Sequence, residues 1–205
     1  MDVLKVEVNH LLVANKNKVL IHDLSFKCTV GIYAIIGQNG SGKTTLLKTL
    51  VGILPIRSGQ ISFIGHDLKR NSIKAKSMIS YIPDKPLAYS FMTGTDYLDL
   101  LASCKGHKDT AEINQHIEMF GISKYLNTKF SEMSLGTQRK FTIIGAMIGR
   151  PQVIIMDEPL NGLDIESQKI FVHYINNQKL DKTIIFTSHS ENFLNEMNPE
   201  KIVLS

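Results

Sequence analysis

Several residue types are scarce in this sequence of 205 residues, and their scarcity excludes some classes of protein. Tryptophan is absent, and the two cysteines, Cys28 and Cys104, lie far apart without the spacing of metal ligands. A disulfide framework and a metal site built on cysteines are therefore excluded. We expect both thiols to be buried or incidental in a reducing compartment.

Long apolar runs are also missing. A membrane-spanning helix needs roughly 20 consecutive apolar residues, whereas the most apolar stretch, residues 143–156, is interrupted by Arg150 and Pro151. Residues 1–5 lack a cationic segment followed by an apolar one, so no secretory signal is predicted. We expect a cytoplasmic protein, and any contact with a membrane requires another chain to hold it there.

Charge of one sign is not concentrated in any segment. The sequence has 23 Lys and Arg residues against 19 Asp and Glu residues, which gives a net charge of +4. The basic residues are scattered, and the lysines of residues 16–18 and 69–76 are typical of solvated turns. We therefore expect no nucleic-acid partner, and the weak positive balance is compatible with an anionic membrane surface.

Apolar segments alternate with segments of helical periodicity through most of the chain. Residues 4–13 and 19–26, separated by a polar turn at 15–18, predict an antiparallel hairpin. Buried strands that alternate with helices predict an α/β fold with a parallel sheet covered on both faces. We expect the other strands at residues 32–36, 60–65, 78–82, 153–156, 183–187 and 201–205, and helices at residues 46–50, 134–149 and 165–178.

A glycine-rich stretch with the pattern G-x-x-x-x-G-K-T lies between an expected strand and an expected helix. Its glycines allow tight turns and close approach, so that backbone amides and the helix N-terminus surround phosphate oxygens. Lys43 is placed to reach the β and γ phosphates, and the Thr44 hydroxyl to bind Mg²⁺. The stretch predicts a site for a nucleoside triphosphate. Its residues are Gly37, Gln38, Asn39, Gly40, Ser41, Gly42, Lys43, Thr44 and Thr45.

A second acidic motif follows the buried strand at residues 153–156. Asp157 comes at the end of that strand, where it can hold Mg²⁺ beside the phosphate loop. The adjacent Glu158 can orient or deprotonate an attacking water molecule. With the phosphate loop, these two carboxylates predict hydrolysis of a triphosphate.

The sequence pattern changes in residues 84–134, because apolar residues recur there at helical spacing and not in strand-like runs. We expect a helical insertion, with Thr95 and Asp109 as the N-caps of its helices. The chain is then one domain over residues 1–205. Residues 1–84 and 150–205 form its nucleotide-binding core, and residues 85–149 form a helical subdomain.

Three further segments, in this order, make the chain similar to the ATP-binding-cassette (ABC) family along almost its whole length. One resembles the family's L-S-G-G-Q signature, one its D-loop and one its switch histidine. In this chain they read Met133-Ser134-Leu135-Gly136-Thr137-Gln138, Pro159 with Asn161-Gly162-Leu163-Asp164, and Thr187-Ser188-His189. Each segment alone is a weak signal, whereas the order and spacing of all three are specific.

The resemblance implies the P-loop NTPase fold of ABC ATPases, with a parallel sheet core, an antiparallel β subdomain and an inserted α-helical subdomain. It implies ATP and Mg²⁺ as ligands, and two cassettes packed head to tail as a homodimer with ATP between them. Ser134 and Gly136 then contact the γ phosphate that the partner cassette holds. His189 is implied to contact the γ phosphate and to hold Glu158 and water in line. Asp164 is implied to shape the interface between the two sites.

The chain departs from the family pattern at several positions. Asp84 stands where the family usually has Gln, and because an ionised Asp is shorter and only accepts hydrogen bonds, it is either part of the Mg²⁺ shell or a hinge. No aromatic residue precedes Phe26 to stack on adenine, which leaves aliphatic contact from Leu12 or Val13. The signature has Leu135 in place of its first glycine.

The leading hypothesis is the ATPase subunit of an export-type membrane transporter, bound to the cytoplasmic face of the cell membrane by a transmembrane permease on a separate chain. The apolar residues 86–91 are expected to receive that permease, unless Tyr89 and Phe91 belong to the core of the helical subdomain. The second hypothesis is a soluble ABC protein of iron–sulfur assembly, DNA repair or translation. The third is another P-loop enzyme such as a kinase, against which the signature and His189 both count.

Overall fold

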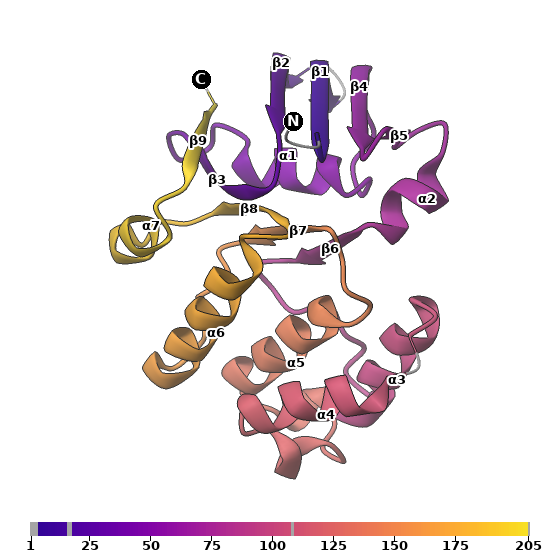
Figure 1. Ribbon diagram of the computed structural model, residues 1–205, viewed down its shortest axis with the longest axis vertical. Helices are drawn as coiled ribbons and strands as arrows, with labels where there is room; N and C mark the ends of the chain where they lie inside the picture. The colour runs from indigo at the N-terminus through magenta and orange to yellow at the C-terminus, as the bar shows by residue number, and fades with distance from the viewer. Residues whose placement is uncertain (1–3, 16–17, 108, 205) are drawn as a thin grey trace.

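The computed structural model describes residues 4–15, 18–107 and 109–204, which form two β-sheets with helices around one of them (Figure 1). The larger sheet has five strands in the order β6-β7-β8-β3-β9, and all neighbours are parallel. The smaller sheet is antiparallel, with the order β2-β1-β4-β5. The strands are β1 (Val6–Asn15), β2 (Lys18–Cys28), β3 (Gly31–Ile36), β4 (Ser58–Phe63), β5 (His66–Asp67), β6 (Ile79–Ile82), β7 (Val153–Asp157), β8 (Thr183–Thr187) and β9 (Glu200–Val203).

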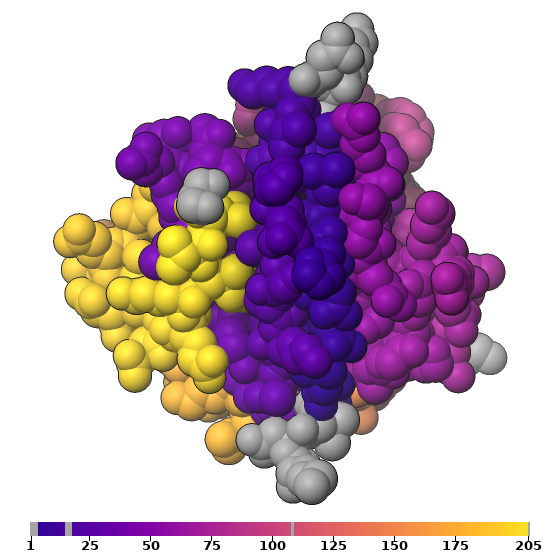
Figure 2. Space-filling view, turned by 90° about the horizontal axis from the view of Figure 1, so that it is seen from above, coloured from indigo at the N-terminus to yellow at the C-terminus, as the bar shows by residue number. Residues whose placement is uncertain are grey.

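The helices cover both faces of the parallel sheet. Helix α1 lies between the two sheets, whereas α5 and α6 cover the opposite face of the parallel sheet (Figure 1). The antiparallel sheet closes the α1 side, and its strands β2, β1 and β4 lie side by side in Figure 2. The helices are α1 (Lys43–Leu50), α2 (Ser72–Ser77), α3 (Gly94–Cys104), α4 (Thr110–Met119), α5 (Leu135–Met147), α6 (Ile165–Gln178) and α7 (Glu191–Met197), with 3₁₀ turns at Ser123–Tyr125 and Phe130–Glu132.

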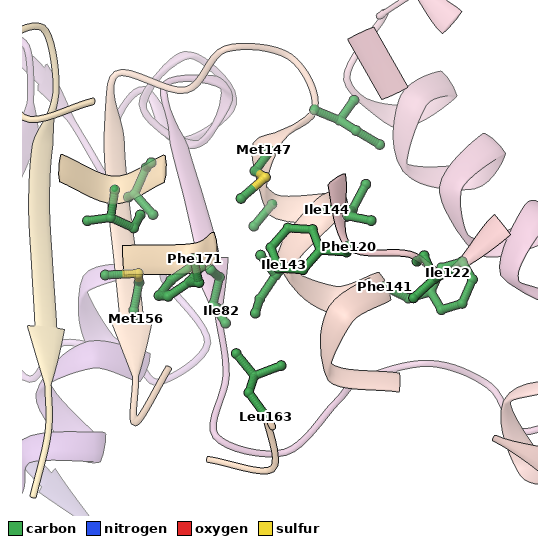
Figure 3. Packing of buried hydrophobic residues seen from close by; sticks show 14 of the residues in the cluster. Ile82, Phe120, Ile122, Phe141, Ile143, Ile144, Met147, Met156, Leu163 and Phe171 are labelled. Carbon is green, nitrogen blue, oxygen red and sulfur yellow. The ribbon is translucent and has the colours of Figure 1, made fainter. Parts of the chain in front are cut away.

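Residues 153–156 of strand β7 are all apolar because the strand is buried on both faces of the sheet. Its five residues are all buried, and successive side chains alternate between two hydrophobic clusters on the two faces of the sheet. Val153 and Ile155 join the cluster under the antiparallel sheet, and Met156 joins the cluster under the helices. Figure 3 shows members of the latter cluster, with Met156 and Ile82 coming from the sheet and Phe141 from α5.

Residues 94–147 form the expected helices, but one predicted N-cap is wrong. Asp109 caps α4 by accepting from the amides of Ala111 and Glu112. The cap of α3 is Thr93, which forms a reciprocal capping box with Asp96. Thr95 lies inside that helix instead, where its hydroxyl donates to the Leu126 carbonyl at 3.1 Å.

Lys105, at the C-cap of α3, ties the helical segment to the sheet. Its ammonium donates to Ser80 Oγ of β6 at 2.9 Å, and to the carbonyls of Gly145 and Ile148 at the end of α5 at 3.0 and 2.8 Å. Enclosure among neutral acceptors lowers the pKa of Lys105 to about 8, because burial disfavours its charged form. One cation therefore joins two helix ends and a strand.

Most other sequence expectations match the structure. The hairpin of β1 and β2 is confirmed, with its predicted turn residues 16 and 17 outside the described residues. Cys28 is buried and Cys104 is exposed. Helix α7 was not predicted, because its seven residues are too few to show a helical period. No helix within the described ranges has both the length and the apolar character that crossing a bilayer requires.

Candidate nucleotide and metal site

The predicted phosphate loop connects β3 to α1, and its conformation requires glycine. Gly42 has φ of 97° and is the N-cap of α1, with no side chain capping that helix. A Cβ on Gly37 would lie 2.7 Å from the Leu204 carbonyl oxygen. The first amides of α1 therefore have no side-chain acceptor from the cap, which is the arrangement that receives phosphate oxygens at a helix N-terminus. Within the described residues, the buried Ser41 hydroxyl also has no partner.

The Lys43 ammonium lies against the loop itself. Its Nζ donates to the carbonyls of Gly37 and Gln38 at 2.8 and 3.1 Å. A flexible side chain held by two exposed carbonyls exchanges them readily for a more negative acceptor. The cation is therefore already at the loop where the predicted triphosphate would bring its charge.

Asp157 is the best candidate ligand for Mg²⁺. It is 2% exposed, and its Oδ1 accepts from the hydroxyls of Thr44 at 3.2 Å and Thr187 at 2.7 Å. Its Oδ2 is buried without a hydrogen-bond partner among the described residues. A buried carboxylate oxygen with no donor is costly unless a cation completes it. Thr44 and Asp157 together therefore fit the hard oxygen donors that Mg²⁺ prefers.

The described residues hold no group of three or more His, Cys, Asp or Glu side chains placed to bind a metal ion.

Thr187 is a site residue that the sequence did not single out for a role of its own. It pairs with Asp157 in the register of β7 and β8. Its hydroxyl donates to Asp157 Oδ1 and accepts from the Glu158 backbone amide at 3.2 Å. One buried hydroxyl thus orients the carboxylate of the predicted metal ligand and fixes the backbone of the next residue. Its position at the end of the neighbouring parallel strand was the available signal.

Glu158 and His189 lie together, as the sequence predicted. Glu158 Oε2 accepts from the His189 backbone amide at 3.1 Å, and its Oε1 lies 3.5 Å from His189 Nε2. Glu158 has φ of 46°, an uncommon value for a residue with a side chain. The Glu158 side chain is 15% exposed and the His189 side chain 64%. The carboxylate is therefore shielded but reachable, as a base for a water molecule must be.

Asp84 lines the same cavity as Thr44 and Asp157, a space of about 480 Å³. Its Oδ1 accepts from the side-chain amide of Asn161 at 2.9 Å. Asp84 therefore links the loop after β6 to the loop after β7, while its position in the cavity keeps it near the predicted metal ligands.

Ser134 and Gly136 are not hydrogen-bonded to the phosphate loop of their own chain. Ser134 is the N-cap of α5 and accepts from the Thr137 amide at 3.2 Å. A Cβ on Gly136 would lie 2.7 Å from the Gly162 carbonyl oxygen, so glycine is needed for the close approach of these two loops. The neighbouring Leu135 is 60% exposed. The predicted signature thus presents a helix N-terminus and an apolar side chain at the surface.

Asp164 is held within its own chain. It caps α6 by accepting from the Ser167 amide and hydroxyl, each at 2.8 Å, and its Oδ2 pairs with Lys140 Nζ of α5 at 3.1 Å. These hydrogen bonds lower the pKa of Asp164 to about 2. The residue therefore couples α5 to α6 as a fixed anion.

One candidate for base recognition is wrong. Val13 is 2% exposed and belongs to the hydrophobic cluster between the sheets, so its side chain is not available to adenine. Leu12 is half-buried and remains a candidate. The alternation of strand β1 explains the difference, since neighbouring residues face opposite sides of a sheet.

A family model described as ABC transporter matches residues 21–161, which include the phosphate loop, the signature segment and both acidic residues. The chain belongs to the ABC transporter family. This confirms the expected ABC ATPase fold, with its parallel and antiparallel sheets, and ATP as the nucleotide.

Two relatives and one solved structure illustrate what the chain is similar to. The chain is 31% identical over 176 residues to the bacitracin transport ATP-binding protein BcrA of Enterococcus faecalis, covering 84% of this chain and 56% of that protein. It is 29% identical over 192 residues to the human phospholipid-transporting ATPase ABCA3, covering 90% of this chain and 11% of that protein. A solved ATP-binding subunit of an ABC transporter superposes with a TM-score of 0.90 at 26% identity, covering 98% of this chain and 85% of that one. The chain therefore spans only part of the length of BcrA and of ABCA3.

Replacing Thr187 with valine tests the site. The change removes the hydroxyl that serves both Asp157 and Glu158 but keeps the shape of the side chain. We expect Mg²⁺-dependent ATP hydrolysis to fall by about 10- to 100-fold, the usual effect of losing a partner that orients a metal ligand. Steady-state rates at saturating ATP and Mg²⁺ measure the change.

Thr183→Val is the matched control. Thr183 is equally buried at the other end of β8, and its hydroxyl donates to the Thr29 carbonyl at 2.6 Å. This variant should lose thermal stability but keep its rate per folded chain. Equal losses of rate in the two variants would show that Thr187 acts only through stability.

Proposed function

We propose that this chain is the ATP-hydrolysing subunit of a membrane transporter of the export type. It pairs head to tail with a second cassette, as a homodimer, and docks on a transmembrane permease at the cytoplasmic face of the membrane. The observation that carries the proposal is the partition of the site: the phosphate loop, Asp157, Glu158 and His189 converge within one chain, whereas Ser134 and Leu135 of the signature are exposed at the surface.

The bound triphosphate is held by the loop at residues 37–45. The amides at the start of α1 donate to its phosphate oxygens, and Lys43 moves from the loop carbonyls to the β and γ phosphates. Thr44 and Asp157 hold Mg²⁺, with Asp84 facing the same cavity. When bound there, Mg²⁺ would neutralise part of the negative charge of the triphosphate.

Hydrolysis is assigned to Glu158. Its carboxylate takes the proton of the attacking water or aligns that water with the γ phosphate. The His189 amide and ring hold the two carboxylate oxygens from one side. His189 also donates to the γ phosphate. The Thr187 hydroxyl accepts from the Glu158 backbone amide and donates to the metal ligand Asp157, so it fixes the position of one relative to the other.

Pairing of two cassettes completes the site. Ser134 and the amide of Gly136 contribute a hydroxyl and a helix N-terminus to the γ phosphate bound by the partner cassette. ATP then favours the paired state, and hydrolysis releases it, because the two states bind ATP and ADP with different affinities. Asp164 and the exposed Leu135 lie at the same surface, beside Gly162.

An apolar surface after Asp84 is the proposed docking site for the permease. Leu87, Tyr89 and Phe91 are 64%, 67% and 69% exposed, and the two aromatic rings stack at 5.5 Å. This excludes the alternative that Tyr89 and Phe91 belong to the core of the helical segment. A groove of about 360 Å³ beside them is lined by Leu87, Ala88, Tyr89, Met92, Tyr97, Leu100 and Leu101. Exposed apolar surface of this kind marks interaction sites.

Glu158→Gln tests the catalytic role. The amide cannot take a proton, so we expect hydrolysis to fall by about 10²-fold or more, the usual contribution of a general base. ATP binding should persist, and an ATP-dependent dimer should accumulate in size-exclusion chromatography with light scattering. Glu196→Gln, an exposed change on α7, is the control and should behave as the parent. A parental rate in Glu158→Gln would refute the assignment.

The double variant Tyr89→Ser with Phe91→Ser tests the docking surface. After expression in the source cell and solubilisation of its membranes, we expect the parent to co-purify with a transmembrane chain and the variant to be lost from that complex. The ATPase rate of the isolated variant should stay unchanged. Ile73→Ser is the control, because Ile73 is 86% exposed but lies on α2. Retention of the variant in the complex would rule out this surface.

A further inference from the structure

Arg139 of α5 is the largest fully buried side chain among the described residues, with 1% of its surface exposed. It is buried beneath the acidic motif and makes every one of its hydrogen bonds to backbone carbonyls. Its guanidinium nitrogens donate to the carbonyls of Pro83, Asp84 at 3.2 Å, Asp157 at 3.2 Å, Glu158 at 2.8 Å and Pro159 at 3.2 Å.

The five carbonyls belong to two neighbouring strand ends. Two lie just after β6, in the loop that leads to Asp84, and three lie at the end of β7 and after it. Strands β6 and β7 are paired in parallel, so both loops leave the sheet at the same edge. One side chain therefore fixes the exits of both strands, and it does so from the helix that begins at the signature.

The choice of acceptors distinguishes this arginine from a buried ion pair. A guanidinium has five N–H donors in a rigid planar fork, and here they go to backbone oxygens and to no carboxylate oxygen of the described residues. A side chain that binds only backbone fixes the path of the chain. Burial makes such hydrogen bonds strong and costly to lose.

Glu158 lies in the second of these loops and has a backbone conformation that needs support. Its φ of 46° lies in the left-handed region, which is unfavourable for a residue with a Cβ. Arg139 Nη2 donates to the two carbonyls that flank the Glu158 Cα, those of Asp157 and Glu158. A strained backbone persists only where its surroundings hold it. Arg139, the Thr187 hydroxyl and the Asn161 amide, which donates to the Glu158 carbonyl at 3.1 Å, hold this one.

We propose that Arg139 is a positioning residue for ATP hydrolysis, which holds Glu158 in its strained conformation and joins it to the signature helix of the same chain. This rests on the proposed function. The N-terminus of α5 contacts the nucleotide that the partner cassette binds. Arg139, five residues after the N-cap Ser134, donates hydrogen bonds to the end of β7, which contacts the chain's own nucleotide. A shift of α5 when the partner's nucleotide binds is thereby passed to Glu158.

Arg139→Lys tests the positioning role. Lysine keeps a positive charge, but its three donors at one point cannot span five carbonyls. We expect kcat to fall by about 100-fold, as for a misplaced reacting group. The affinity for ATP should change by less than about threefold, since the hydrogen bonds of Arg139 go to the loops after β6 and β7 and not to the phosphate loop. Thr142→Val is the control, a buried change on the same helix whose hydroxyl donates to the Gln138 carbonyl.

Two results would overturn the inference. One is a parental kcat in Arg139→Lys, and the other is a loss of kcat that matches the loss of folded protein. If the parent itself does not hydrolyse ATP, the proposed function fails and the inference fails with it. Hydrolysis by the parent with an unaffected Arg139→Lys variant overturns the role of Arg139 alone.

Hydrogen exchange keeps the inference testable even if Arg139→Lys does not fold. In Glu158→Gln, saturation with ATP and Mg²⁺ should slow amide exchange together in residues 135–147 and 157–161, because Arg139 joins them. Slowing in the helix without any change in residues 157–161 would contradict the link.

Discussion

The carboxyl ends of four parallel strands meet at one edge of a buried sheet, and the chemistry of this protein depends on that convergence. The phosphate loop follows β3, Asp84 follows β6, Asp157 and Glu158 come at the end of β7, and Thr187 ends β8. Residues from distant parts of the sequence come into hydrogen-bond contact only because strand order and register bring them there. The two hydrophobic clusters on either face of the sheet hold this register in place.

The parts of the candidate site that the sequence could predict are those with local signatures. The phosphate loop and the Asp157-Glu158 pair have fixed spacing and a strand before them, so short-range patterns were sufficient. Thr187 and Arg139 could not be predicted in the same way, because their partners are a side chain on the next strand and backbone carbonyls. Backbone carbonyls have no sequence identity, so no pattern marks them.

Two predictions from the sequence are wrong, and each error has a physical reason. Thr93 rather than Thr95 caps α3, since the reciprocal capping box with Asp96 is more favourable than a single hydroxyl near the same turn. Val13 is unavailable to adenine because the register of β1 turns it into the core. Whether Tyr89 and Phe91 were core or surface could not be decided from composition, because an apolar loop segment has no period. Their exposure decides it.

The central claim is that each nucleotide site is built from two chains, and complementation between two inactive variants tests it most directly. Lys43→Ala removes the ammonium group that binds the phosphates in this account, and Ser134→Ala removes the hydroxyl of the signature. A mixed dimer has one site with both defects and one site with neither. We predict that mixing the two variants restores ATP hydrolysis well above the average of the separate proteins. A rate that stays at that average, with both variants folded, would contradict the account.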